Sequence, residues 1–156
     1  MMVDRRIEKL DSLGAPTGGD REKILNMASI AEAEVNTKDD YGKVIRVILN
    51  RLDKGMTLGM DSTVAYGNNV KSAQITQKML DDGSNEFNTR IHKGLPPTPI
   101  SNPGDSAIQA AIDPPQGNWL YFVTTDLNSG ETEFTDNADE FDRLVQKYKA
   151  NNKSAN

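Results

Sequence analysis

The apolar residues between positions 20 and 35 recur with the period of an α-helix. At about 100° per residue they spread over more than half of the circumference, so the pattern predicts a largely buried helix. The apolar positions are Ile24, Leu25, Met27, Ala28, Ile30, Ala31 and Val35. Glu32 and Glu34 interrupt this apolar arc, whereas the arc leaves three polar positions for water. These positions are Glu22, Asn26 and Ser29.

Two glutamates within an apolar arc raise a question of function. A carboxylate pressed against apolar surface loses hydration, which raises its pKa and prepares it to act as a general acid near neutral pH. Partly buried glutamates also pair with Lys or Arg in purely structural networks. The pattern around Glu32 and Glu34 therefore leaves both interpretations open.

The rest of the chain shows further helical patterns and a few short strand patterns. Helices are predicted over residues 3–13, from Asp39 or Asp40 to a stop at Gly55, and over 72–83, 105–113 and 137–150. Strands are predicted over 62–67, 118–125 and 131–135, the last two as a hairpin. The two helices before residue 55 should form an αα-hairpin over one core. Helices that come first, with few strands between them, predict an α+β fold, mostly helical with a small sheet.

The length of 156 residues fits a single domain with a sizeable core. We expect a flanking segment over 1–19, a globular domain over 20–150 and a polar tail over 151–156. Four of the seven prolines lie between Pro96 and Pro103. They stiffen a long loop and fix its path, and a rigid irregular loop of this length usually serves a site.

Composition excludes several classes of protein. The net charge of −5, without a large Lys/Arg cluster, disfavours a nucleic-acid surface. The chain has no cysteine and one histidine, His92, which excludes thiolate zinc sites and multi-histidine metal sites. Neither a membrane-spanning run nor the apolar region of a signal peptide is present. No metal or cofactor is expected.

Several ordered motifs carry a family resemblance. "ASIAEAE", "VILNRLDKGMTLGMDSTVAYG", "FNTRIHKGLPPTPISNPG", "AIQAAIDPP" and "YFV" occur in that order. In order and spacing they resemble the YceG-like endolytic murein transglycosylase family over roughly residues 24–134. The run from Gly94 to Gly104 is the most specific part.

The resemblance implies a bacterial enzyme, a lyase that cuts peptidoglycan glycan strands between N-acetylmuramic acid and N-acetylglucosamine. The cut is non-hydrolytic and leaves 1,6-anhydro ends. The family's catalytic glutamate, the first acid of its "ASI-x-E-x-E" run, falls on Glu32, and Glu34 corresponds to the second acid. A single carboxyl can serve as acid and then as base in such a reaction.

Other residues are candidates for substrate-binding or supporting roles. They are Glu34, Asn50, Arg51, Asp61, Thr63, Tyr66, Asn88, Thr89, His92, Pro96, Pro97 and Asn102.

Most of these candidates also have a structural interpretation. Asp61 either supplies a second acid or closes a turn, and Tyr66 either stacks on a sugar or packs. Asn88 and Thr89 either bind sugar groups or form a turn, His92 either stabilises the loop or borders a subsite, and Arg51 either favours the helix dipole or holds a buried carboxylate.

The chain also departs from the family pattern. Thr132 and Phe141 stand where family members commonly carry histidines, and Phe87 replaces a tyrosine. The family's usual N-terminal membrane anchor and LysM-like domain are not recognised, so we expect a catalytic-domain fragment of a protein at the extracytoplasmic face of the membrane. Glycan strands are the expected partner, with cell-wall synthesis proteins as further candidates. A lysozyme-like hydrolase and a non-catalytic glycan-binding module remain the alternatives.

Overall fold

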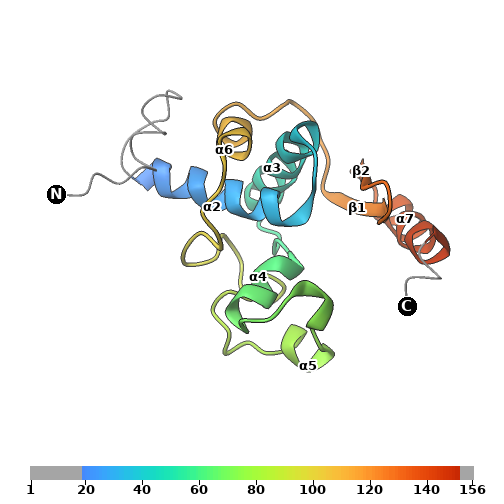
Figure 1. Ribbon diagram of the computed structural model, residues 1–156, viewed down its shortest axis with the longest axis horizontal. Helices are drawn as coiled ribbons and strands as arrows, with labels where there is room; N and C mark the ends of the chain where they lie inside the picture. Colours follow the sequence, from blue (N-terminus) through green and yellow to red (C-terminus); the bar gives the residue numbers. More distant parts are fainter. Residues whose placement is uncertain (1–18, 152–156) are drawn as a thin grey trace.

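The computed structural model describes residues 19–151, so the helix predicted over residues 3–13 lies outside the described part. Three helices form the centre: α2 (Gly19–Glu34), α3 (Lys38–Asp53) and α6 (Asp105–Ile112). Each of them packs against the other two (Figure 1). Apolar side chains of α2 and α3 make most of the core. The prediction of a buried helix followed by a second helix over the same core is confirmed.

The first turn of α3 is capped by a residue that the sequence did not single out. The Thr37 hydroxyl accepts a hydrogen bond from the Asp40 amide at 3.3 Å. The prediction that Asp39 or Asp40 is the cap is therefore wrong, and both lie in the first turn, where a carboxylate favours the helix dipole. Gly55, predicted as the stop, follows the helix with a φ of 70°, a conformation that glycine adopts without strain.

Residues 62–67, predicted to be a strand, belong instead to helix α4 (Asp61–Gly67). The β-branched pair Thr63 and Val64 favours a strand locally, but both side chains are buried in the helix. The Thr63 hydroxyl donates to the Met60 carbonyl at 2.6 Å, a bond back along the chain that threonine makes in helices. Tertiary packing overrides the local preference here.

The single helix predicted over 72–83 is divided into a short 3₁₀ turn, η1 (Ser72–Gln74), and α5 (Gln77–Leu80). Ile75 is extended, and the Thr76 hydroxyl accepts from the Met79 amide at 3.2 Å. A cap inside the predicted helix thus ends one turn and starts the next.

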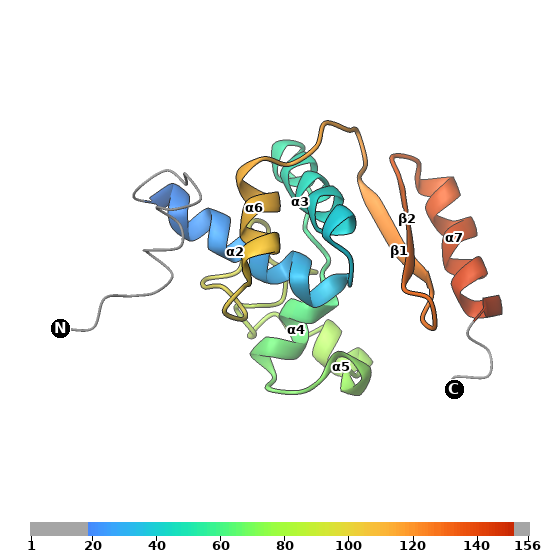
Figure 2. The same cartoon turned by 45° about the horizontal axis from the view of Figure 1, so that its top comes forward.

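The C-terminal part is a hairpin backed by a helix. Strands β1 (Tyr121–Asp126) and β2 (Glu131–Thr135) pair antiparallel, with Phe122 opposite Phe134. Helix α7 (Ala138–Asn151) packs on β1. Figure 2 shows β1, β2 and α7 as a C-terminal layer beside the helical body, which consists of α2 to α6 and the loops between them. The hairpin and the closing helix confirm the prediction and, with the helical body, the α+β fold. Within the described residues, no helix is long and apolar enough to cross a membrane.

Candidate active site

The two glutamates of α2 have different surroundings. Glu32 is exposed, and its carboxylate accepts a hydrogen bond from the Gly104 amide at 3.0 Å. Glu34 is half-buried and accepts from the Ser62 amide at 3.3 Å, in the first turn of α4. The prediction that Glu32 presses against apolar surface is therefore wrong, and Glu34 is the glutamate that loses its hydration.

Burial raises the pKa of Glu34 above the ordinary value for a glutamate. The nearby negative charge of Asp61 raises the pKa further, whereas hydrogen bonding from Ser62 and the positive charge of Arg90 oppose the rise. The raised pKa thus favours the protonated form of Glu34, while Ser62 and Arg90 lie close enough to stabilise the carboxylate. This combination suits a group that gives up a proton and later takes one back.

Glu34 lines a pocket of about 200 Å³. The helical body contributes the polar lining, which includes Asp61 and Arg90 beside Glu34. The C-terminal layer contributes three apolar residues, Phe122, Val123 and Phe141. Arg51, Leu58, Gly59 and Met60 complete the lining. The pocket therefore joins one apolar wall to a cluster of ionisable groups.

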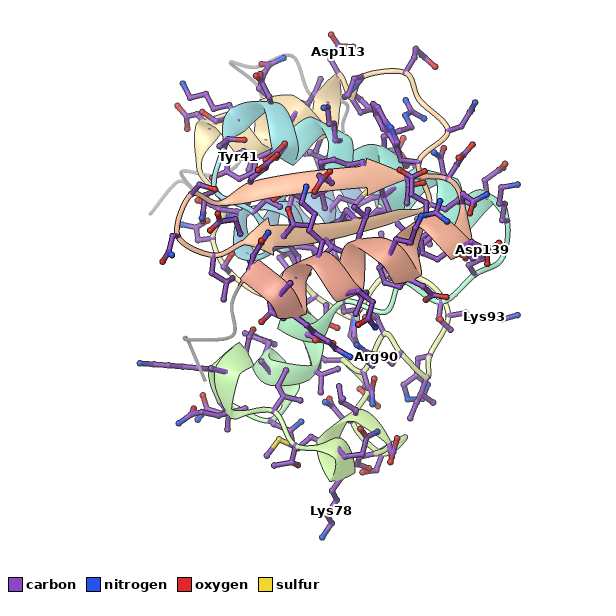
Figure 3. The ribbon with its side chains drawn as sticks, turned by 90° about the vertical axis from the view of Figure 1, so that its right-hand side faces the viewer. Tyr41, Lys78, Arg90, Lys93, Asp113 and Asp139 are labelled. Atoms are coloured by element: carbon purple, nitrogen blue, oxygen red, sulfur yellow. The ribbon has the colours of Figure 1, made fainter. Side chains whose placement is uncertain are left out.

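Asp61 and Arg90 form an ion pair at this pocket. Both Nε and Nη2 of Arg90 lie 2.8 Å from Oδ1 of Asp61, and each side chain is close to half exposed. Figure 3 shows Arg90 below α7, at its junction with the part of the chain that carries α4 and α5. Arg90 was not among the candidate site residues, although it directly follows the motif residues Asn88 and Thr89.

Asn50 and Arg51 bind backbone carbonyls rather than a carboxylate. The Asn50 amide donates to the carbonyls of Gly117 and Trp119 at 3.1 and 2.9 Å. Arg51 donates to the Leu120 carbonyl at 2.6 Å, and two further bonds go to the carbonyls of Thr57 and Leu58. The interpretation of Arg51 as the holder of a buried carboxylate is therefore wrong. Asn50 and Arg51 thus fasten the segment that precedes β1 to α3. This attachment fixes the apolar lining from the C-terminal layer relative to the polar lining from the helical body.

Three other candidates are structural because their side chains are buried. Thr63 and Thr89 share a hydrogen bond of 2.8 Å between their hydroxyls, and the Thr89 hydroxyl also accepts from the Met60 amide at 2.9 Å. Asn88 is fully buried and bonds backbone groups on both sides of it in the sequence. None of the three offers a group to a glycan.

Tyr66 and His92 lie outside the pocket lining. Tyr66 is 47% exposed and its ring packs against Phe87 with 5.0 Å between centroids. The ring nitrogen Nε2 of His92 lies 2.8 Å from the Gly83 carbonyl oxygen. That contact agrees with the loop-stabilising interpretation of His92.

The proline loop is tied to α2 by a ladder of hydrogen bonds. Asn26 donates to the Pro96 carbonyl at 2.8 Å, and the Ser29 hydroxyl accepts from the Ile100 amide at 3.0 Å. Both side chains are buried, so the prediction that they face water is wrong. Together with the Gly104 bond to Glu32, these contacts recur every third residue along α2.

No residue from 94 to 104 lines the Glu34 pocket. Among the loop candidates, Pro96 is buried, whereas Pro97 and Asn102 are exposed.

Among the described residues, two hollows of about 450 and 620 Å³ lie beside α6 and the start of α3, and one of about 380 Å³ lies beside the end of α3. Glu34 does not line any of them. Within residues 19–151, no group of three or more His, Cys, Asp or Glu side chains converges so as to hold a metal ion. The chemistry available to the described part of the chain therefore centres on Glu34.

Comparisons with known proteins place this chain beside proteins of one family. The model of the YceG-like family matches residues 1–147. An endolytic murein transglycosylase of Bacillus subtilis (strain 168) is 37% identical over 126 residues, 81% of this chain and 34% of that protein. An endolytic murein transglycosylase of Streptococcus pneumoniae serotype 2 is 27% identical over 132 residues, 81% of this chain and 23% of that protein.

A crystal structure of a YceG-like protein from Listeria monocytogenes superposes with a TM-score of 0.74 at 31% sequence identity. The match covers 90% of this chain and 44% of that one. This chain therefore spans about a third or less of the length of these two relatives, and under half of the solved protein.

Proposed function

We propose, from the premise that this chain belongs to the YceG-like family, that the chain is a catalytic domain of an endolytic murein transglycosylase. Glu34 is its general acid. The observation that carries the proposal is the half-buried Glu34, with its raised pKa, in a pocket with Asp61 and Arg90. The names of the relatives support murein as the substrate.

The choice of Glu34 differs from the residue that the resemblance suggested. Glu32 is exposed and bonded to Gly104, and it does not line the pocket. A general acid needs a proton at neutral pH and must reach the scissile oxygen within hydrogen-bond distance. Burial raises the pKa of Glu34 and so favours the first condition, and its place in the pocket lining serves the second.

The reaction begins when the Glu34 carboxyl protonates the glycosidic oxygen of a bound strand, and the bond from that oxygen to the muramyl anomeric carbon breaks, so that the oxygen leaves as a hydroxyl of the next sugar. The resulting carboxylate is stabilised by the Ser62 amide and by the positive charge of Arg90. The same carboxylate then takes the proton from the muramyl 6-hydroxyl as that oxygen attacks the anomeric carbon. Proton balance is closed within the pair of steps, and a single group performs both.

Attack by the 6-hydroxyl is favoured because the group belongs to the same sugar as the reacting carbon. Well-oriented intramolecular groups reach effective concentrations on the order of 10⁵ M or more, far above that of water. The Asp61 carboxylate has one oxygen occupied by two donors of Arg90, which orients it and stabilises its charge.

A hydrolase is the second candidate, because Asp61 lines the same pocket as Glu34. Two carboxyls flanking one bond are the usual equipment of glycoside hydrolases, where the second activates water or forms a covalent bond. In that reaction Asp61 would activate water or attack the anomeric carbon, and the muramyl 6-hydroxyl would take no part.

Murein is an extracytoplasmic polymer. We propose that the complete protein acts on glycan strands at the outer face of the bacterial membrane.

Single-residue variants test the assignment of the acid. Glu34→Gln should lose at least two to three orders of magnitude of sacculus-cleaving activity, the usual scale for a lost general acid, and keep its fold. Glu32→Gln, on the same helix, is the matched control and should retain most of the activity. Loss confined to Glu32→Gln would move the role to Glu32, and full activity in both variants would refute a catalytic glutamate on α2.

A further inference from the structure

Phe141 has no role in the proton transfers proposed above, yet its ring borders the same pocket as the Glu34 carboxyl. It comes from α7 in the C-terminal layer, whereas Glu34 and Asp61 come from the helical body. The side chain is half-buried. A large ring beside a proposed general acid is well placed to contact whatever that acid protonates.

An aromatic stack with Tyr121 fixes the position of the Phe141 ring. Tyr121 stacks on it with 5.0 Å between centroids and 22° between the ring planes. Tyr121 in turn lies 5.1 Å from the guanidinium carbon of Arg51, which three backbone carbonyls hold. Tyr121 thus covers one face of the Phe141 ring, and Phe141 itself is among the residues that line the pocket.

The two kinds of lining suit the two kinds of surface on a sugar. A pyranose ring presents apolar C–H groups on its faces and hydroxyl, acetamido and glycosidic oxygens around its rim. An aromatic ring packs against apolar C–H surface, while ionisable groups bind the oxygens. A sugar lying on Phe141 would turn its rim toward Glu34, Asp61 and Arg90.

We propose that Phe141 is a substrate-binding residue that packs against the face of the pyranose ring next to the scissile bond. The aromatic wall holds the sugar by its apolar face and leaves the glycosidic oxygen within reach of the Glu34 carboxyl. This inference rests on the proposed function, since the sugar belongs to a murein strand. It assigns a contact on α7 that neither the family motifs nor the acid chemistry requires.

Binding is measured in the Glu34→Gln protein, so that the glycan is not cleaved. The probe is a tetrasaccharide of alternating N-acetylglucosamine and N-acetylmuramic acid, titrated by isothermal calorimetry. Adding Phe141→Leu should raise the dissociation constant by roughly five- to tenfold, the scale of a lost aromatic contact. Phe141→Tyr keeps the ring and should stay within about twofold of the parent protein. Val145→Ala, one turn further along α7 and outside the lining, is the control and should bind normally.

A second measurement needs no change at position 141. Nuclear Overhauser effects between the ring protons of Phe141 and the sugar C–H protons should appear in the complex. Binding that is unchanged by Phe141→Leu, or the absence of those effects in a formed complex, would overturn the stacking role and leave the proposed function standing. Failure of the Glu34→Gln protein to bind the tetrasaccharide would overturn the murein assignment and this inference together.

Discussion

Asn88 is expected to act through stability rather than through substrate binding. Its side-chain nitrogen donates to the carbonyl oxygens of Met79, Leu80 and Asp82 at 3.3, 3.0 and 3.1 Å. Its side-chain oxygen accepts from the Arg90 amide at 3.0 Å. Asn88 thereby binds the carbonyl oxygens at the end of α5 and positions the backbone of Arg90, which lines the pocket.

The cost of removing Asn88 follows from these contacts. Each bond contributes about 0.5 to 1.5 kcal/mol, and a buried carbonyl left without a donor costs about 1 to 3 kcal/mol. Because two hydrogens serve three acceptors, we expect Asn88→Ala to lower the free energy of unfolding by about 3 to 5 kcal/mol. Asn88→Asp should cost at least as much at pH 7, since a carboxylate would face three carbonyl oxygens.

Urea unfolding followed by circular dichroism measures this cost in wild type and both variants. Asn68→Ala is the matched control, because its half-buried amide bonds the single carbonyl of Val64 at 3.0 Å, and it should cost only about 1 kcal/mol. Under conditions where Asn88→Ala remains folded, its affinity for murein fragments should be close to that of wild type. Wild-type stability together with lost glycan affinity would refute the structural role of Asn88.

Two further predictions concern the pocket. The pKa of Glu34 is raised by burial, so the native state binds more protons than the unfolded chain between the ordinary glutamate pKa and the raised one. The free energy of unfolding should therefore fall as pH rises through that window, and Glu34→Gln should abolish this dependence. Cleavage should also decline as pH rises through the raised pKa. A pH series of unfolding and activity measurements tests all three expectations. Arg51→Lys should cost about 1 to 3 kcal/mol and speed hydrogen exchange across β1 and β2, because lysine cannot serve the three carbonyls that Arg51 binds. Arg46→Lys, which replaces a donor to the Pro115 carbonyl alone, is the control, and equal effects of the two changes would contradict the fastening role of Arg51.

The sequence was most informative where structure depends on neighbours along the chain. The helical period placed Ile24 to Ala31 in the core, and the polar run between the last two strands predicted their hairpin. It failed at residues 62–67, where the β-branched Thr63 and Val64 lie in a buried helix. Local preference amounts to tenths of a kcal/mol for such residues, less than the free energy gained by burying them.

The site depended on contacts that a helical projection does not contain. Glu32 and Glu34 look alike on α2, and what separates them is Gly104, 72 residues away, and Ser62, 28 residues away. Motif resemblance selected Asn88 and Thr89 together with Asp61, but only Asp61 of these reaches the pocket. A motif thus marks residues that matter without separating those that build the fold from those that line the site.

The measurement that tests the central claim most directly is the chemistry of the cut ends. Purified sacculi are digested with the protein in ¹⁸O-labelled water, and the fragments are examined by mass spectrometry before and after borohydride treatment. With Glu34 as a single acid and base, new ends should be 1,6-anhydro-N-acetylmuramic acid, one water lighter than hydrolytic ends, unlabelled and resistant to borohydride. Reducible ends that carry the heavy oxygen would contradict the account and identify a hydrolase, for which Asp61 is the candidate second carboxylate.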